Sequence, residues 1–172
     1  MAMPAFIAEV LKRERMPFVT LKHPPAYTAL EQAAVSHVPG RCSAKVVICI
    51  ADDKPVQAVV PAHYLLDLEQ LRLAANASTL RLAREDEIAA LYPEFDVGAM
   101  PPFGTLRGHR VFVEHSFVGE PEMVFSAGTH TDSICMHYAD FAEMVKPIVG
   151  AFGVRPGRRT TRRSPAAENQ AS

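Results

Sequence analysis

Apolar and polar positions along the chain follow short periods that predict a series of strands and helices. The most apolar segment is AKVVICIA at 44–51, a continuous and largely β-branched run that is typical of a buried strand. The turn DDKP follows, and VQAVVPA at 56–62 returns as a second strand. These two segments predict a buried pair of strands within a larger sheet.

Apolar residues at helical spacing, together with end signals, predict five helices. The predicted ranges are 4–15, 28–36, 65–75, 84–92 and 139–150. Thr28 and Glu31 supply the T-x-x-E of a capping box, so the second helix is expected to start at Thr28. Pro147 lies inside the last helix and is expected to shorten or bend it.

Further apolar runs predict strands at 18–23, 80–83, 110–117, 122–128 and 133–138. The last three follow one another at hairpin spacing. Strands in hairpins with helices packed outside predict an α+β domain, α/β-like in its mixture of elements, around a mixed and largely antiparallel central sheet. The length of 172 residues fits a single domain of this kind.

Charge is unevenly distributed along the chain, whose formal net charge is −1. From Arg155 onward, five arginines and one glutamate give +4, whereas the remaining 13 basic and 18 acidic residues give −5. The acidic part does not resemble a general nucleic-acid binder, so any such contact must be local or helped by the basic end. We therefore predict a domain at 1–154 and a basic, disordered tail at 155–172, for which a solvated role is favoured over phosphate binding.

Several classes of protein are disfavoured by what the sequence lacks. No apolar run approaches the roughly 20 residues of a membrane helix. The N-terminal MAMPAFIAEVLKRER places its charges after a short apolar part, unlike a signal peptide, so we expect a cytoplasmic protein. Cys42, Cys49 and Cys135 show no paired spacing and no CxxC, which predicts buried free thiols rather than disulfides or a zinc site.

Motifs for the common catalytic chemistries are missing as well. The sequence holds no HExxH, no G-x-S-x-G elbow and no GxxxxGK[ST] phosphate loop. A metal-dependent hydrolase, a serine acyl-enzyme and an ATP-driven reaction therefore lack support from the sequence. We expect neither a metal nor a cofactor.

Three segments carry residues that could support chemistry. Lys45 opens the most apolar strand and could bind a phosphate or a developing oxyanion, although a strand-edge lysine that reaches water is the more ordinary role. The stiff loop GAMPPFG, from Gly98 to Gly104, could aim backbone N–H groups at a carbonyl group, or it could close over the core. His130 lies in the turn of SAGTHTDSICM, where a solvated histidine is the ordinary alternative.

In combination, these segments resemble a known family. They are the lysine of A-K-V-V-I at 44–48, the G-x-x-x-P loop at 98–102 with its following Phe-Gly, and the S-A-G at 126–128 before an I-x-M-like strand. Over about residues 4–152, the chain resembles the YbaK/prolyl-tRNA synthetase-associated domain family. Its members are free-standing relatives of the bacterial prolyl-tRNA synthetase editing domain. Each motif is modest, but their order and spacing together are fairly specific.

The resemblance implies an α/β or α+β fold and hydrolysis of the ester between a wrong amino acid and the 3′ end of a tRNA. It implies that Lys45 holds the terminal nucleotide or the reacting ester, while Gly98 and Pro102 bound a loop that grips the aminoacyl group. Gly128 and His130 match a G-x-H turn of alanine-removing members. The catalytic candidates are thus Lys45, Gly98, Pro102 and His130. The substrate-binding candidates are Ala99, Met100, Pro101, Phe103, Gly104, Ser126 and Gly128.

Two details leave the identity of the amino acid open. Ser126 matches the S-A-G of cysteine-removing members, whereas His130 matches the alanine type. Val46 follows the lysine at a position where members that edit alanine or cysteine often carry a small polar residue. We therefore expect the removed amino acid to be small, such as Ala, Ser, Thr or Cys.

Such a reaction needs no protein nucleophile, because an aminoacyl ester is already activated and can be hydrolysed by positioning and charge stabilisation. The resemblance adds that water or a substrate group attacks, assisted by the terminal ribose hydroxyl. The expected partner is a mischarged tRNA, bound through its acceptor end, with a synthetase as a further option, no membrane and a monomeric state. The alternative is a non-hydrolytic binding module of the same fold that recognises an acceptor end, a nucleotide or a synthetase.

Overall fold

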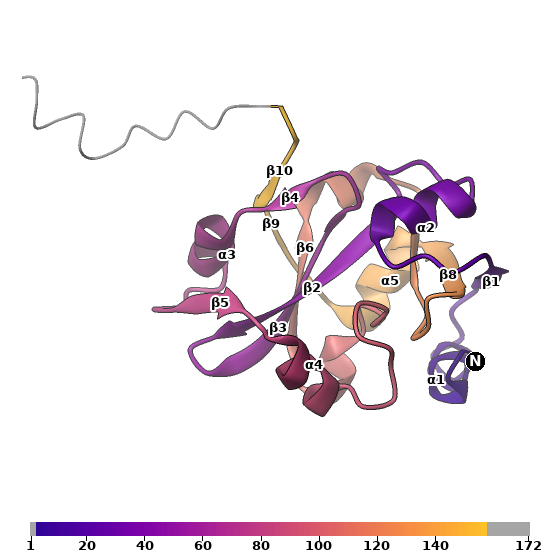
Figure 1. Ribbon diagram of the computed structural model, residues 1–172, viewed down its shortest axis with the longest axis horizontal. Helices are drawn as coiled ribbons and strands as arrows, with labels where there is room; N and C mark the ends of the chain where they lie inside the picture. The colour runs from indigo at the N-terminus through magenta and orange to yellow at the C-terminus, as the bar shows by residue number, and fades with distance from the viewer. Residues whose placement is uncertain (1–2, 158–172) are drawn as a thin grey trace, which may run out of the picture.

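A five-stranded mixed sheet forms the centre of the computed structural model, which describes residues 3–157 (Figure 1). In spatial order its strands are β5 (Leu80–Leu82), β2 (Ala44–Ala51), β3 (Lys54–Pro61), β6 (Arg110–Glu114) and β9 (Ile148–Gly150). The first two junctions are antiparallel and the last two are parallel. β2 and β3 pair along their whole lengths, so they form the longest ladder of the sheet.

A second, antiparallel sheet consists of β1 (Val19–Lys22), β8 (Asp132–His137) and β7 (Glu122–Ser126), in that spatial order. An isolated bridge between Ser43 and Val124 joins the start of β2 to β7, so the two sheets meet there. Near the end of the described chain, β10 (Gly153–Val154) pairs with β4 (Leu65–Leu66).

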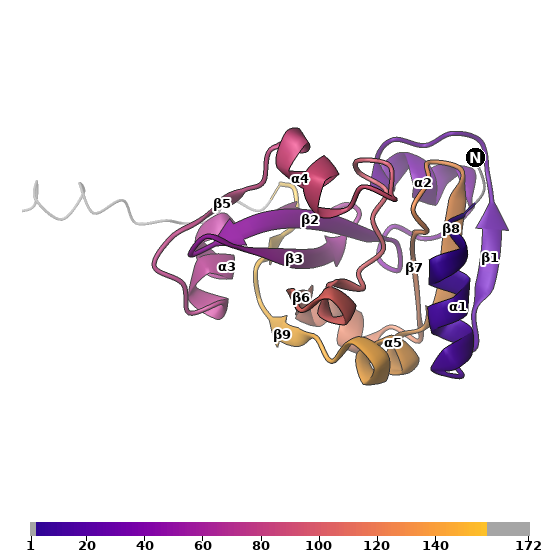
Figure 2. The ribbon, with the colours of Figure 1, turned by 90° about the horizontal axis from the view of Figure 1, so that it is seen from below.

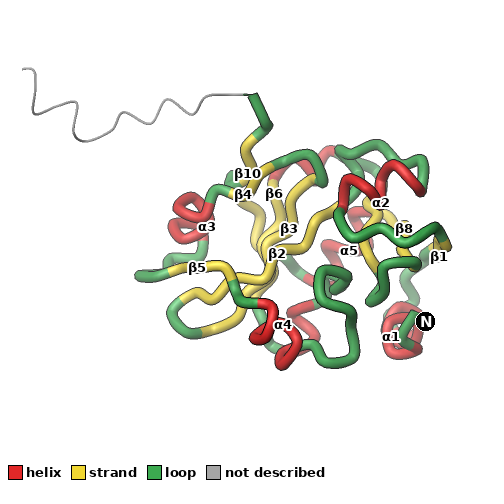
Figure 3. Tube along the Cα trace, viewed as in Figure 1, coloured by secondary structure: helices red, strands yellow, loops and turns green. Residues whose placement is uncertain are grey.

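Helices cover both sheets (Figures 1 and 3). The α-helices of residues 3–157 are α1 (Ala5–Arg13), α2 (Ala29–Val35), α3 (Leu68–Ala74), α4 (Glu85–Leu91) and α5 (Tyr138–Val145), and the 3-10 helices are η1 (Gly104–Arg107) and η2 (His115–Gly119). Figure 2 shows α1 lying along the three-stranded sheet and α4 lying over β2. The layers are therefore mixed, with helices outside the sheets.

The central strands are buried on both faces, which explains their continuous apolar sequence. Ile48 belongs to the apolar cluster that contains Met100 and continues into the three-stranded sheet. Cys49, the next residue, belongs to the cluster around Leu71 of α3. Successive side chains of β2 thus pack into the two apolar clusters on opposite faces of the sheet, because side chains alternate along a pleated strand.

Local capping signals set where the helices begin. The Thr28 hydroxyl accepts from the Glu31 N–H at 3.1 Å, while the Glu31 carboxylate accepts from the Tyr27 N–H at 2.9 Å, so α2 starts where the T-x-x-E motif predicted. Asp67 caps α3 in the same way through the N–H groups of the next turn. The helix predicted at 65–75 therefore begins only at Leu68, because residues 65–66 form β4.

The predicted fold class is confirmed as a single α/β-type domain with a mixed sheet and outer helices, but the predicted strands divide between two sheets. The runs at 122–128 and 133–138 do form a hairpin, β7–β8. The run at 110–117 does not join it, because β6 lies parallel to β3 and β9 in the other sheet and residues 115–119 turn into η2.

The helix predicted at 139–150 ends early, at Val145. Lys146 adopts a left-handed φ of 54°, and Pro147 lacks the N–H that a further helical turn needs. Residues 148–150 become β9 instead, which pairs with β6. The expected shortening by Pro147 is thus confirmed, while the new strand was not predicted.

The C-terminal part of the prediction is only partly covered by the described residues. Among residues 3–157, Val154 is the last strand residue, and the Arg155 guanidinium lies 5.9 Å from the ring centroid of Tyr64. Residues 158–172, which hold most of the predicted basic tail, lie outside the described residues. Among residues 3–157, no helix has the length and apolar character that a membrane crossing needs.

Candidate active site

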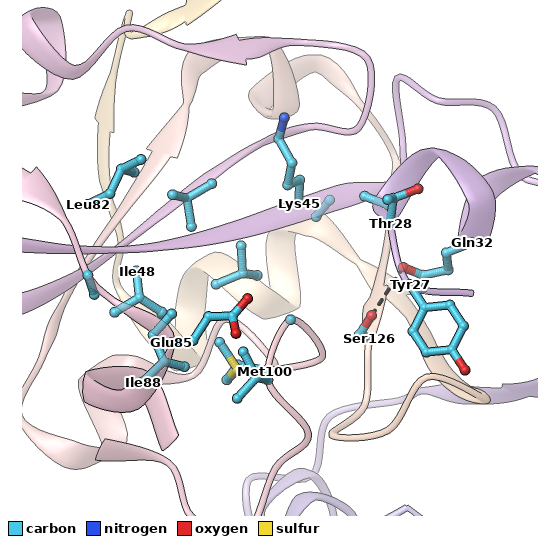
Figure 4. Close-up of a pocket in the computed structure, with 17 residues that line it drawn as sticks. Tyr27, Thr28, Gln32, Lys45, Ile48, Leu82, Glu85, Ile88, Met100 and Ser126 are labelled. Carbon is cyan, nitrogen blue, oxygen red and sulfur yellow. Dashed lines mark hydrogen bonds between the residues drawn. The ribbon is translucent and has the colours of Figure 1, made fainter. Parts of the chain in front are cut away.

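A pocket of about 390 Å³ opens beside the first half of β2 (Figure 4). Its walls come from five segments that are far apart in the sequence. These are the start of α2 within 27–32, β2 within 44–48, the β5–α4 junction within 82–88, the loop within 97–100, and Ser126 at the end of β7. The pocket therefore lies where both sheets and two helices meet.

One edge of β2 is free at the pocket because its neighbour β5 is short. β5 pairs only with residues 49–51, and just beyond it the Ala83 N–H donates to the Ile48 carbonyl at 3.0 Å. Backbone groups of an antiparallel strand point alternately to its two sides, so those of Val46 point the same way as those of Ile48. Val46 thus directs a backbone donor and an acceptor to the pocket, while its side chain packs partly against the apolar cluster.

Lys45 lies on the opposite face of β2 from Val46. In Figure 4 its side chain extends from the strand on the side away from Met100. Its Nζ donates to the Tyr64 carbonyl at 2.7 Å, and burial lowers the pKa of Lys45. An ammonium group has three N–H donors, so a single carbonyl acceptor leaves two for water or a ligand.

The loop from Gly98 to Gly104 is held from inside the protein by Gln57, a buried side chain of β3. The Gln57 Oε1 accepts from the Gly104 N–H at 3.0 Å, and its Nε2 donates to the Pro101 carbonyl at 3.4 Å. A methyl group at Gly104 would lie 2.9 Å from the Gln57 side chain, so the close approach requires glycine. The loop is therefore stiff for structural reasons, and it presents Met100 to the pocket.

The same loop is fastened to the turn that follows β7. The Gly128 N–H donates to the Ala99 carbonyl at 2.8 Å, and the Asp96 N–H donates to the Gly128 carbonyl at 2.9 Å. Gly128 has a φ of +91°, and a Cβ there would lie 2.8 Å from Pro4. The G-x-x-x-P and S-A-G motifs thus form one hydrogen-bonded unit, in which Gly128 serves the packing.

His130 lies beside the pocket rather than among the residues that line it. Its ring centroid is 4.8 Å from that of Tyr27. Its Cε1 is the nearest atom, at 3.8 Å, to the position of a Cβ on Gly98. Since Tyr27 and Gly98 both line the pocket, His130 supports the rim between them.

The pocket has one polar end, formed by Ser126 and Gln32. The Ser126 hydroxyl donates to the Gln32 Oε1 at 3.2 Å (Figure 4). Gln32 is only 2% exposed, which is rare for glutamine. Glu85, at the start of α4, adds a carboxylate to the lining.

Gln32 and Glu85 were not predicted from the sequence. A glutamine inside an amphipathic helix and a glutamate in the first turn of a helix both resemble ordinary surface positions. The only available signal for Gln32 was the capping motif at Thr28, which fixes the start of α2 and hence the residue that faces inward one turn later.

The structure brings four of the predicted site residues together around the pocket: Lys45, Gly98, Met100 and Ser126. The remaining predicted residues lie outside its lining, and most of them are buried behind it; they are Ala99, Pro101, Pro102, Phe103, Gly104, Gly128 and the half-buried His130. Their observed contacts hold the loop at 98–104 and the turn after β7 in place behind the pocket.

The pocket offers hydrogen-bonding groups, an ammonium and a carboxylate.

Two cysteines that lie outside the pocket lining have raised pKa values. Burial raises the pKa of Cys49 to about 12, and burial, followed by the effect of the nearby Glu122, raises the pKa of Cys135 to about 11. Both thiols therefore remain protonated at neutral pH and are poor nucleophiles. Within residues 3–157, no group of three His, Cys, Asp or Glu side chains is placed to hold a metal ion.

Comparison with known proteins gives a family and a fold. The family described as Aminoacyl-tRNA editing domain matches residues 23–144, a range that includes every segment of the pocket. No curated protein matches the chain.

Several solved structures share the fold. The crystal structure of a hypothetical protein, APE2540, is 19% identical with a TM-score of 0.78, and the match covers 86% of this chain and 98% of that one. A candidate trans-editing enzyme for prolyl tRNA synthetase is 19% identical with a TM-score of 0.75, covering 88% of this chain and 98% of that one. A candidate signal transduction protein from Marinobacter aquaeolei is 17% identical with a TM-score of 0.71, covering 98% of this chain but 35% of that one.

Proposed function

Because the chain belongs to the aminoacyl-tRNA editing domain family, we propose that it hydrolyses the ester of a mischarged aminoacyl-tRNA in trans and releases a small amino acid such as Ala, Ser, Thr or Cys. The observation that carries this proposal is the convergence of Lys45, the loop at 98–104 and Ser126 on one pocket. These three segments are separated by some fifty and some twenty residues of sequence, and only the fold unites them.

The size and polarity of the pocket suit an aminoacyl group on a ribose. Its volume of about 390 Å³ falls within the roughly 300–1,000 Å³ of small-molecule sites. Ile88 and Met100 provide apolar walls for a short side chain, while Glu85 and Ser126 provide oxygen acceptors for an α-ammonium group. A bulky side chain would have to displace Met100, which is 3% exposed and belongs to the stiff loop.

In the proposed reaction, water attacks the ester carbonyl carbon and forms a tetrahedral intermediate with a negatively charged oxygen. The Val46 N–H supplies a dipole for this oxygen, and the Lys45 ammonium supplies positive charge once it turns from the Tyr64 carbonyl toward the bound ester. The intermediate then collapses, the bond to the ribose oxygen breaks, and that oxygen takes up a proton as the tRNA leaves. Because the ester is already activated, this stabilisation and the fixed geometry of the pocket are sufficient without a protein nucleophile.

A panel of tRNAs mischarged with Ala, Ser, Thr or Cys tests the proposal. We expect at least one ester to be hydrolysed much faster than in buffer, and Lys45→Ala to remove most of this acceleration. Because the Lys45 side chain is only half-buried, we expect the variant to stay folded, and circular dichroism checks this as the control. A rate equal to that in buffer for every ester would refute hydrolysis.

A second candidate function is a non-hydrolytic binding module of the same fold. The observation that favours it is Val46, whose apolar side chain lies in the lining at a position where editing members often carry a small polar residue. This candidate predicts saturable binding of aminoacyl-tRNA without turnover. Rapid turnover of any ester in the panel excludes it.

A further inference from the structure

A chain of four side chains runs from the pocket along one face of the three-stranded sheet to its far edge, beside β1. Ser126 bonds to Gln32 at 3.2 Å, Gln32 to Ser133 at 2.5 Å, Ser133 to the Nε2 of His23 at 2.7 Å, and the Nδ1 of His23 to the Pro24 carbonyl at 2.8 Å. Its middle members, Gln32 and Ser133, are 2% and 0% exposed, so water hardly competes for their bonds. We call Ser126, Gln32, Ser133 and His23 the polar relay.

The fold explains why these four side chains meet. Ser126 and Ser133 are direct partners in the β7–β8 ladder, so their side chains lie on the same face. Gln32 reaches both serines from α2. His23 follows directly after β1, which pairs with the other edge of β8, and its backbone N–H is anchored on the Thr131 carbonyl.

The relay has a fixed direction, which can be deduced from one end. The Pro24 carbonyl only accepts, so the Nδ1 of His23 carries the hydrogen, and in a neutral imidazole Nε2 is then an acceptor. Ser133 must give its only hydrogen to that Nε2, which leaves Ser133 to accept from the Gln32 amide nitrogen. The Gln32 oxygen therefore faces Ser126 and takes the hydrogen of its hydroxyl group.

From this direction we propose that Gln32, Ser133 and His23 are positioning residues that hold the Ser126 hydroxyl as a hydrogen-bond acceptor for the α-ammonium group of the bound amino acid. With its hydrogen committed to Gln32, Ser126 offers only lone pairs to the pocket. It selects ligands that present a donor there, and it disfavours those that present a carbonyl or no polar group. This inference rests on the proposed function for the identity of the ligand.

Two probes measure this selection without any hydrolysis. They are 3′-(L-alanylamino)-3′-deoxyadenosine, an amide analogue of the alanyl ester, and the matching 3′-propionylamino compound, which lacks the ammonium group. We expect the wild-type protein to bind the alanyl probe about tenfold more tightly than the propionyl probe, as one hydrogen bond to a charged group implies. Isothermal titration calorimetry gives both dissociation constants.

Changes within the relay should alter this ratio and not merely the stability. Gln32→Met keeps the length of the side chain but removes the acceptor of Ser126, so the ratio should fall about fivefold. Ser133→Ala releases the Gln32 amide from its fixed orientation and should lower the ratio about threefold. Ser43→Ala is the matched control, because Ser43 is also 0% exposed and its hydroxyl has no hydrogen-bond partner among the described residues.

Gln32→Glu sharpens the test. Its carboxylate still accepts from Ser126, so the preference for the alanyl probe should persist. A carboxylate cannot donate to Ser133, however, so Ser133 must donate to it, and the Nε2 of His23 must then carry a hydrogen as well. Imidazole ¹⁵N NMR should therefore show His23 protonated only on Nδ1 in the wild type and on both nitrogens in Gln32→Glu.

The possible results separate this inference from the proposed hydrolysis. A wild-type His23 protonated on Nε2 alone, an unchanged probe ratio in both Gln32→Met and Ser133→Ala, or equal binding of the two probes by the wild type would each overturn the relay. The expected ratios without turnover of any mischarged tRNA would support the relay while refuting hydrolysis. If Gln32→Met does not fold, Ser133→Ala and the NMR measurement still decide the question.

Discussion

Glu114 and Lys45 are two ionisable side chains, one buried and one half-buried, and their hydrogen-bonding environments differ. The Glu114 carboxylate is 1% exposed and accepts from the N–H groups of Phe152 and Gly153 at 2.9 and 2.6 Å, with His115 at 2.8 Å as a further contact. The Lys45 ammonium has one backbone carbonyl, and burial lowers its pKa.

The difference indicates what each charge is for. A buried carboxylate that accepts from backbone N–H groups fixes structure, and Glu114 fixes the chain segment that leads into β10. A partly buried ammonium whose N–H donors are not all used can still bind a ligand. Lys45 is such a group, and it lines the pocket.

The largest effect is expected at Glu114. Glu114→Ala leaves one buried and one half-buried N–H group without an acceptor, at about 1–3 kcal/mol each, so the free energy of unfolding should fall by about 3 kcal/mol. Both N–H groups donate to the same oxygen, Oε2, so Glu114→Gln can keep both bonds through its amide oxygen and should lose about half of that, because only the negative charge is removed. Thermal denaturation measures both losses, as a fall in Tm of several degrees.

The same variants also show whether the role of Glu114 is purely structural. At a temperature where Glu114→Gln is folded, its kcat/KM should lie within about twofold of the wild type. Tyr64, whose carbonyl holds Lys45, lies next to Gly153. A tenfold loss of activity in a folded Glu114→Gln would therefore show that the bonds from Glu114 to Phe152 and Gly153 also position Lys45.

Lys45 should show the reverse behaviour. Lys45→Met removes charge stabilisation and should lower kcat/KM about 100-fold, which corresponds to about 2.7 kcal/mol in the transition state. Its Tm should change by less than about 2 °C, because the desolvation of the ammonium is removed along with its hydrogen bond. Kinetics on the best ester of the panel, next to a melting curve, give both numbers.

The pH dependence identifies the charge as the cause. Since burial lowers the pKa of Lys45, the ammonium is lost at a lower pH than in an ordinary lysine. The rate of the enzyme relative to spontaneous hydrolysis should therefore decline on the alkaline side before an exposed lysine would titrate. Lys45→Arg keeps its charge there and should show no such decline, even if its overall rate is lower.

Two glycines extend the comparison to the backbone. Gly128→Ala combines a φ of +91° with a Cβ only 2.8 Å from Pro4, so it should lower the stability by about 2 kcal/mol. Gly98→Ala has a similar φ of +87°, but the nearest atom would be 3.8 Å away, so about 1 kcal/mol is expected. Gly98 lines the pocket, and its variant should lose kcat/KM severalfold, whereas a folded Gly128→Ala should not. Equal stability losses for the two would contradict this assignment.

The sequence allowed the prediction of those strands and helices that a local pattern determines. The strands at 44–51 and 56–62 were recognisable because burial on both faces leaves a continuous β-branched run, and Thr28 marked the start of α2. β9 was missed because three residues carry no period of their own. It exists because β6 offers a free edge and Lys146 turns the chain out of α5.

The candidate site was predicted in its parts but not in its connections. Of the eleven residues to which the resemblance pointed, Lys45, Gly98, Met100 and Ser126 share the pocket, and the other seven lie outside its lining. The resemblance did not reveal Gln32, because a side chain that bonds to two strands a hundred residues away looks like any polar helical position. Long-range hydrogen bonds of this kind depend on the assembled fold, and no local pattern encodes them.

The smallest effect on stability is expected at Glu87, an ion-paired carboxylate that lies outside the pocket. Glu87 binds Arg81 through two bonds of 2.7 and 2.9 Å and accepts from the Arg84 N–H at 3.0 Å, so it ties α4 to β5. Hydrogen bonding to Arg81, more than any other cause, lowers the pKa of Glu87 to about 2. Because the pKa of Glu87 is lower in the folded state than in the unfolded state, ionised Glu87 stabilises the fold at pH values above the ordinary glutamate pKa. This stabilisation is lost as the pH falls through about 2.

Glu87→Gln should therefore have a slightly lower Tm than the wild type at pH 7, and the two melting temperatures should converge as the pH approaches 2. A gap that stays constant down to pH 2 would assign the loss to packing at α4 rather than to the charge.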